Sequence, residues 1–423
     1  MFENFSNYIV NKETTEKNNF IWNMLGSGIY SASSMILSLV VIKIVGASEG
    51  GVFAIALTLS QMLVYIAYFE MRTFQVTDVR DEFKFSEYHS GKLITCLLMI
   101  IVCSVYVWVK RYDSNKVIVI LLVCFSRLVD GYADVYEAHF QKIGRLDLAG
   151  KSLAYRTSLF VVALIVGLLV SGKLIYSLIF ADVVAIIGLW IFDINIMNAL
   201  GKIAISKCGE NIKKILINCF PLFIGVFCWT YILSASRIAI DGNLASKYQS
   251  YYQIIFMPVS VINLFAGFVL RPVLPKLADE YCNGLYKAFK KNICNVMLGI
   301  MTITFVCMIG AYILGVPVLS ILSGCDLHDY RVVLTFLIFS GGINAIAFTL
   351  YYVLTIMRCM KSVLIDYILA AVLAALISVP MVKVHAIAGA AFSFFITVSV
   401  LSILFVASIL KKIYLIKKGR KGY

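Results

Sequence analysis

Twelve apolar runs, each about long enough to span a lipid bilayer, dominate the sequence. A helix needs about 20 predominantly apolar residues to cross the hydrocarbon core. Of the 423 residues, 61% are apolar and 14% are charged, whereas soluble proteins have about 45–50% and 25%. The sequence therefore predicts an all-α integral membrane protein, and it excludes a soluble enzyme, a disordered chain and a disulfide-stapled secreted domain. The runs lie near residues 20–45, 50–70, 92–109, 117–138, 153–170, 174–197, 214–236, 250–270, 292–315, 332–356, 362–382 and 386–410.

The positive charges predict how these runs are oriented. If the N-terminus is cytoplasmic, 27 of the 37 Lys and Arg residues fall on the inner connections, including Arg72, Lys92 and Arg156. Only 9 fall on the outer connections, and Arg127 lies within a run. Positive residues collect on the cytoplasmic side of membrane proteins, so we expect twelve transmembrane helices with both termini cytoplasmic. The net charge of +14 is assigned to this bias and not to nucleic-acid binding, because no soluble segment interleaves basic and aromatic residues.

A polar break after the sixth run divides the chain into two sets of six. Six is an even number, so the two sets would enter the membrane with the same polarity, as parallel repeats. The predicted divisions are a cytoplasmic N-terminal segment (1–19), an N-terminal six-helix bundle (20–200), a cytoplasmic linker (201–213), a C-terminal six-helix bundle (214–410) and a basic cytoplasmic tail (411–423).

Helix-weakening residues occur at similar depths in the first and seventh runs. Gly26 and Gly28 lie in the first, and Pro221 and Gly225 in the seventh. Both residue types weaken a helix locally, and paired interruptions in corresponding helices mark where transporters bind and bend. We predict a hinge at these four residues, although Gly and Pro are also simply more frequent in membrane helices.

The fourth run carries a stripe of ionisable residues. Arg127, Asp130, Asp134 and Glu137 are spaced 3, 4 and 3 residues apart, with Gln141 four residues further on, so they share one helix face. Charges within the bilayer are costly and usually face a cavity or a partner. The fourth run is therefore expected to face protein or water.

Two interpretations of the stripe remain. In one, Arg127 binds the anionic part of a substrate in a central cavity, since its planar fork suits phosphate, while Asp130, Asp134 and Glu137 position it or relay protons. In the other, Arg127 and Asp130 form an internal ion pair that fixes helix packing. The first is favoured because the stripe holds more acids than one arginine neutralises.

Other charged residues near the runs are weaker candidates. Lys43 and Arg237, near the outer ends of the first and seventh runs, either line a cavity or extend toward the interface. Arg271, at the end of the eighth run, either contacts substrate or acts as a positive anchor. Glu70 and Arg72 are expected to form a local pair. The single acids Asp182, Asp193 and Asp366 are candidate cation sites.

No enzymatic motif is present. The four histidines are scattered, and the chain has no Walker A, G-x-S-x-G or H-E-x-x-H motif and no C-x-x-C pair. We therefore predict no catalytic residue, no metal ligand and no cofactor, and we expect the chain not to be an enzyme.

Four segments give the chain a family resemblance. They are Ala47–Phe53 (ASEGGVF), Gln141–Lys151 (QKIGRLDLAGK), Phe256–Leu264 (FMPVSVINL) and Arg271–Ala278 (RPVLPKLA). Each is degenerate, but their order and spacing resemble those of the bacterial polysaccharide flippases. These Wzx-like exporters of lipid-linked oligosaccharides belong to the multidrug/oligosaccharidyl-lipid/polysaccharide superfamily, and the resemblance covers essentially the whole chain.

The resemblance implies two six-helix bundles around a central cavity that opens alternately to each side of the bacterial plasma (inner) membrane. It also implies a polyprenyl-pyrophosphate-linked sugar as substrate, moved outward, with cationic cavity residues such as Arg127 contacting its headgroup. A proton or sodium gradient is a candidate driving force, and glycosyltransferases and a polymerase are candidate partners. The alternatives are a multidrug–cation antiporter of the same superfamily, a membrane glycosyltransferase or polymerase, and a non-transporting scaffold or lipid-binding assembly factor.

Overall fold

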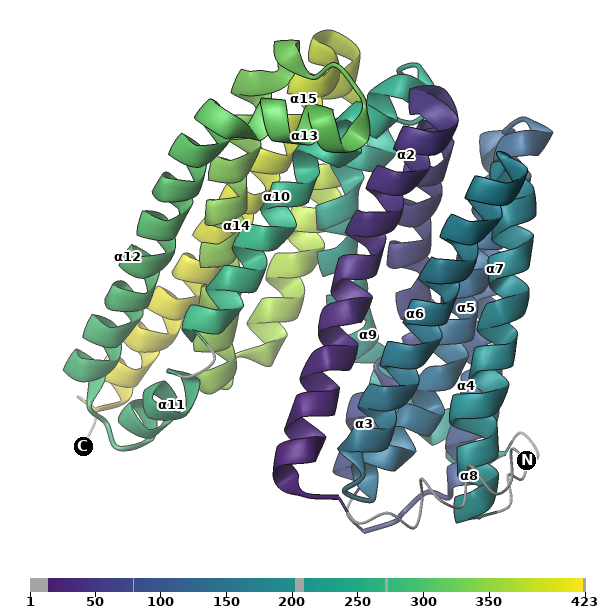
Figure 1. Ribbon diagram of the computed structural model, residues 1–423. Helices are drawn as coiled ribbons and strands as arrows, with labels where there is room; N and C mark the ends of the chain where they lie inside the picture. Colours follow the sequence, from purple (N-terminus) through teal and green to yellow (C-terminus); the bar gives the residue numbers. More distant parts are fainter. Residues whose placement is uncertain (1–13, 79, 202–208, 271–272, 421–423) are drawn as a thin grey trace. The chain divides into compact units, whose positions relative to one another are not determined.

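The computed structural model of the protein describes residues 14–78, 80–201, 209–270 and 273–420 (Figure 1). Within these ranges the chain is almost entirely helical and contains no β-strand. It divides into two compact units, Met1–Phe227 and Cys228–Tyr423. The division falls inside a single helix, α9 (Glu210–Ile240).

The N-terminal unit is built around α5, which is the helix that carries the ionisable stripe. Helix α5 contacts α2, α3, α4, α6, α7 and the π-helical turn η1, and Figure 1 shows it beside α4, α6 and α7. Gly131 permits close approach on one face, because a Cβ atom there would lie 2.6 Å from Cβ of Ala67 in α2. The elements of this unit are α2 (Glu16–Tyr68), α3 (Met71–Thr77), α4 (Phe85–Lys110), α5 (Ser114–Lys142), α6 (Leu146–Ser171), α7 (Leu174–Leu189), η1 (Trp190–Ile194), α8 (Asn195–Leu200) and the first part of α9.

Helix α2 contains two of the predicted runs, and the chain reverses between them. Gly46 has φ 85° and ψ 170°, a conformation that glycine adopts without a side-chain clash. A Cβ atom at Gly50 would lie 2.6 Å from Cγ1 of Ile42, although residues eight apart in a straight helix are separated by about 12 Å along its axis. The hydroxyls of Tyr30 and Tyr68 likewise meet at 3.4 Å. Runs 20–45 and 50–70 are therefore antiparallel neighbours.

The C-terminal unit is built around α14, which contacts α10, α11, α12 and α15. Two adjacent glycines serve two of these contacts: Gly341 lies against Val259 of α10, and Gly342 lies against Thr304 of α12. Small residues let membrane helices pack closely in this way. The elements of this unit are the rest of α9, α10 (Ser246–Leu270), α11 (Leu274–Cys282), α12 (Tyr286–Gly310), η2 (Ala311–Gly315), α13 (Val316–Ser323), η3 (His328–Tyr330), α14 (Arg331–Ile356) and α15 (Met360–Arg420).

Helix α15 also contains two predicted runs. Its backbone leaves the helical region at Ala386, which has φ 49° and ψ −129°. A Cβ atom at Gly389 would overlap the carbonyl of Met381, and the Ser408 hydroxyl donates to Asp366 at 2.7 Å. Both contacts require the two halves of α15 to lie against each other.

Each of the twelve predicted runs is helical in the structure, apart from a turn at Phe69 and Glu70 at the end of the second run. Nine separate stretches of the described chain are long and apolar enough to cross a membrane. Two of them contain the reversals at Gly46 and Ala386, while α5 is long enough but is not among the nine. The protein is a multi-pass helical membrane protein. The count of twelve crossings and the boundaries of the two predicted bundles stay predictions, and most of the linker, at 202–208, lies outside the described residues.

The predicted hinge residues lie within continuous helix. Gly26 serves close packing, because a Cβ atom there would lie 2.5 Å from the carbonyl oxygen of Gly150 in α6. A Cβ atom at Gly28 would meet nothing within 4 Å. Pro221 and Gly225 lie inside α9. Bending at these residues stays a prediction.

Candidate functional site

A cluster of eight ionisable side chains lies inside the N-terminal unit, around α5. Four of its members, Arg127 and three acids, come from the stripe on α5, and the other four come from α3, α4, α6 and η1. We call it the charged cluster. Its members are Arg72, Lys92, Arg127, Asp130, Asp134, Glu137, Arg156 and Asp193.

Arg156 of α6 is the most connected member of the cluster. Its side chain is 2% exposed, and Nη1 donates to Asp193 at 2.7 Å and Nη2 to Glu137 at 2.9 Å. Its Nε donates to Asp130 at 3.3 Å. Ser152, one turn earlier on α6, donates to Asp193 at 2.6 Å. Arg156 thus joins two stripe acids on α5 to Asp193 on η1.

Two other cations bind acids of the stripe. Lys92 of α4 is 1% exposed, and its Nζ lies 2.9 Å from Asp134 while also donating to the carbonyls of Ala67 and Tyr68. Arg72 of α3 contacts Glu137 at 2.9 Å and Asp134 at 3.4 Å. The expected pair of Glu70 with Arg72 is wrong, because Arg72 binds these α5 acids and Glu70 accepts from the Thr73 hydroxyl instead.

Arg127 lies at the end of the stripe and is buried, at 7% exposure. Its Nη1 lies 3.1 Å from Asp130, and its guanidinium lies over the ring of Tyr30, 5.0 Å from the ring centre. The internal ion pair described as the second interpretation of the stripe is therefore present. A role for Arg127 in substrate binding stays a prediction.

The charges of the cluster balance, with four cations facing four acids. The stripe holds more acids than Arg127 alone neutralises, and Arg72, Lys92 and Arg156 supply the other positive charges. From the sequence, Lys92 and Arg156 were expected on cytoplasmic connections. The structure instead places both within helices, fully buried and paired. Buried ion pairs of this kind are stable only when each charge is compensated.

A cavity of about 260 Å³ opens beside the cluster. It is lined by Asp130, Asp134 and Glu137 of the stripe, by Arg72 and Arg156, and by the tyrosines at 30 and 68. A smaller cavity of about 20 Å³ adjoins Arg127. The stripe therefore borders open space inside the N-terminal unit, but its charged groups are engaged with each other.

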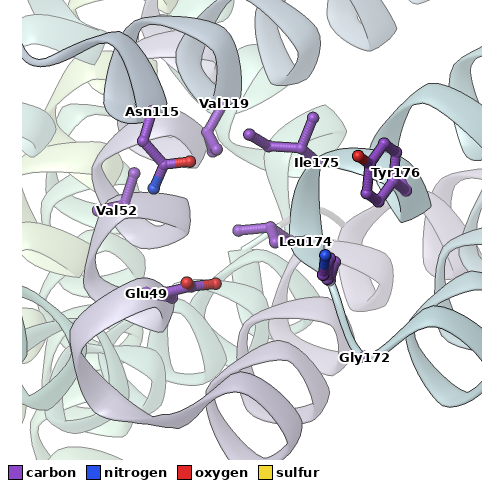
Figure 2. Close-up of a pocket in the computed structure, with 9 residues that line it drawn as sticks. Glu49, Val52, Asn115, Val119, Gly172, Leu174, Ile175 and Tyr176 are labelled. Carbon is purple, nitrogen blue, oxygen red and sulfur yellow. The ribbon is translucent and has the colours of Figure 1, made fainter.

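A third cavity, of about 350 Å³, lies at another place in the same unit, and none of the residues that line it belongs to the charged cluster. Figure 2 shows Glu49 and Asn115 on one side of it and Leu174, Ile175 and Tyr176 on the other. These residues come from α2 just after its reversal, from the start of α5 and from the start of α7.

A polar loop closes one end of the N-terminal unit after α3. Asp78 accepts backbone N–H bonds from Glu82 and Phe83 at 3.0 and 3.3 Å, and a bond from the Tyr88 hydroxyl at 3.0 Å. Burial alone would raise the pKa of Asp78, but these hydrogen bonds outweigh it and hold the pKa below its ordinary value. Lys142, at the end of α5, contacts the same carboxylate at 3.5 Å.

Arg237 of α9, in the C-terminal unit, is a buried cation of a different kind. It is 8% exposed, and no acid in the described residues forms an ion pair with it. Its guanidinium donates to the side chain of Gln253 at 3.4 Å and to the carbonyl of Leu233 at 3.3 Å. The guanidinium also lies over the ring of Phe256. Its Nε has no hydrogen-bond partner.

The other predicted residues are not brought together with Arg237 or with the charged cluster. Lys43 is exposed near the reversal of α2. Arg271 lies outside the described residues. Asp366 accepts from Ser408, whereas neither carboxylate oxygen of buried Asp182 has a hydrogen-bond partner. In the part of the chain that the structure describes, no group of three His, Cys, Asp or Glu side chains is arranged to hold a metal ion.

Sequence reasoning missed the cations that neutralise the stripe. A signal was available, since Arg156 falls inside the run 153–170, Lys92 starts the run 92–109 and Asp193 falls inside the run 174–197. Charges inside apolar runs of neighbouring helices are expected to pair. The count of Lys and Arg residues on the connections did not reveal this, because it placed every positive residue near the end of a run on a connection.

The sequence is similar to that of a protein of capsule biosynthesis. No family model matches the sequence. The chain is 25% identical over 321 residues to the capsular polysaccharide biosynthesis protein CapF of Staphylococcus aureus, covering 75% of this chain and 80% of that protein.

Solved structures of similar fold are membrane transporters. An inward-facing multidrug resistance MATE family transporter of the MOP superfamily matches with a TM-score of 0.63 and 10% identity, over 98% of this chain and 99% of that one. An Asp-to-Asn mutant of the Vibrio cholerae MATE transporter VcmN matches with a TM-score of 0.56 and 13% identity, over 98% of both chains. A MOP superfamily transporter from Pyrococcus furiosus is described as having a binding pocket of reverse polarity. It matches with a TM-score of 0.55 and 11% identity, over 95% of this chain and 99% of that one. The chain therefore has the fold of the MOP superfamily transporters.

Proposed function

We propose that the protein is a flippase that moves lipid-linked oligosaccharides, joined to polyprenyl pyrophosphate, from the inner to the outer leaflet by alternating access. The fold supports transport, and the similarity to a capsular polysaccharide biosynthesis protein supports a cargo for surface polysaccharide. Glycosyltransferases and a polymerase would then act before and after it.

Arg237 is the observation that carries this proposal. The cations of the charged cluster are already neutralised by acids, whereas Arg237 is buried without an acidic partner in the described residues. A buried guanidinium without a counter-ion is costly, and a phosphate oxygen is a ligand that its planar fork accepts. The C-terminal unit is thus suited to an anionic headgroup rather than to a cation.

The test measures labelled lipid-linked sugar at the outer leaflet of cells with and without the gene. We expect Arg237→Gln to reduce outward movement at least tenfold, because loss of one charge-assisted hydrogen bond costs about 1.5–3 kcal/mol. Arg80→Gln removes an equal charge from an exposed loop residue and should leave transport unchanged. Normal export without the gene product would contradict the proposal.

A cation antiporter is the second candidate, and Asp182 is the observation that favours it. A buried carboxylate whose two oxygens lack hydrogen-bond partners suits a proton or another cation. Efflux of a cationic dye that depends on the protein and is lost in Asp182→Asn, with unchanged lipid-linked sugar at the outer leaflet, would favour this function over the flippase.

A further inference from the structure

Inside the C-terminal unit, Arg237 contacts a helix, α10, that carries several buried uncharged polar side chains. Gln249 and Gln253 lie four residues apart on α10 and therefore share a face of that helix. Gln253 accepts a hydrogen bond from Arg237 at 3.4 Å. The Tyr252 hydroxyl donates to Ser236 at 3.1 Å, next to Arg237 in the chain, and so joins α9 to α10 at this level.

Gln249 is the unusual member of this group. It is 3% exposed, and neither its amide oxygen nor its amide nitrogen has a hydrogen-bond partner. Buried amides are nearly always paired, because an unpaired one destabilises the fold. A leucine of similar size would pack without that cost, so the retained amide indicates a ligand that pairs with it.

The chemistry of the Arg237 and Gln249 side chains indicates what kind of ligand this is. A guanidinium binds two oxygens of a phosphate side by side, while a glutamine amide offers an acceptor and two donors. A sugar hydroxyl both donates and accepts, and can pair with either end of the amide. Gln249 lies one helical turn from Gln253 on α10, and side chains one turn apart are about 5–6 Å from each other. Because Gln253 contacts Arg237, a phosphate bound to Arg237 would place the sugar attached to it within reach of Gln249.

We propose that Gln249 recognises a hydroxyl of the first sugar of the cargo while Arg237 binds the adjoining phosphate. This inference rests on the proposed function and adds the residue that distinguishes a glycosylated headgroup from a bare one. Both side chains are covered in this conformation, so the cargo reaches them in another conformation of the transport cycle.

The test compares two probes on purified protein in detergent. One is a short-chain prenyl diphosphate, and the other is the same prenyl diphosphate carrying one N-acetylhexosamine. We expect the wild type to bind the sugar-bearing probe more tightly. Gln249→Leu should weaken binding of this probe about five- to tenfold, the range for loss of a buried hydrogen bond, and leave the bare probe unaffected. The affinity of Gln249→Asn for the sugar-bearing probe should lie between those of the wild type and Gln249→Leu. Arg237→Gln should weaken binding of both probes.

Thermal unfolding without probe separates recognition from a structural role. Gln249→Leu should keep or raise the melting temperature, since it removes an unpaired buried amide. A lower melting temperature together with equal losses for both probes would show that Gln249 is structural. Unchanged binding of both probes would show that it contacts only water, and either result overturns the inference. If the wild type binds neither probe, the proposed function itself fails.

Discussion

Arg156 makes more ion pairs than any other member of the charged cluster. Each of its three nitrogens donates to a different acid, namely Asp130, Glu137 and Asp193. Lysine cannot replace this geometry, because an ammonium lacks the planar fork that reaches three partners in fixed directions.

We expect Arg156→Leu to destabilise the protein by about 3–5 kcal/mol, the cost of leaving buried charges without a partner. The measurement is thermal or denaturant unfolding in detergent. Combining Arg156→Leu with Asp193→Asn should recover part of the loss, because the two side chains share one interaction. Arg145→Leu is a matched control, since Arg145 pairs with Asp147 outside the charged cluster and its loss should destabilise the protein less. Equal stability of Arg156→Leu and wild type would show that the cluster is not held by this residue.

The stripe on α5 could be predicted from spacing alone, because 3.6 residues per turn fixes which side chains share a face. Its partners could not, because pairing depends on which helices pack against α5 and at what height. Lys92 and Arg156 sit at the ends of apolar runs, where a sequence cannot show whether a long side chain extends to water or turns into the protein.

At the level of whole helices, the two reversals use different residues for the same task. Gly46 carries the positive φ in α2, whereas an alanine does so in α15. A non-glycine residue in a sparsely populated backbone region costs about 1–3 kcal/mol. The separate apolar runs on either side of each reversal could be predicted from the sequence, but the backbone geometry that joins them could not.

We expect Ala386→Gly to stabilise the protein by about 1 kcal/mol, because relief of backbone strain exceeds the added entropy of the unfolded chain. Unfolding measured in detergent tests this. Ala390→Gly, one turn away in regular buried helix, is the control and should destabilise by about 1 kcal/mol. If both changes lower stability equally, Ala386 is not strained.

Across the whole molecule, the two units treat buried charge differently. The N-terminal unit neutralises its cluster internally, while the C-terminal unit keeps Arg237 without an acid in the described residues. The helical membrane architecture followed from the apolar runs, because their length leaves few alternatives. This difference between the units did not, because it depends on contacts between helices distant in sequence.

If the cargo is anionic, its outward movement should respond to membrane potential. When the inside of the membrane is negative, outward movement of each negative charge is favoured by a free energy of about 2.3 kcal/mol per 100 mV. In vesicles containing the purified protein and a fluorescent prenyl diphosphate lipid, an imposed inside-negative potential should accelerate movement to the outer leaflet. The opposite polarity should slow it, and indifference to both polarities would mean that no net charge moves with the cargo.

The tight reversals at Gly46 and Ala386 also determine where the chain can be tagged. The helices on either side of each reversal approach within contact distance, so no spare chain exists there to accommodate an epitope or a protease site. Reporter insertions meant to map sidedness should disrupt biogenesis at these two points. The stretch at 324–327, between α13 and η3, is the better choice for such insertions.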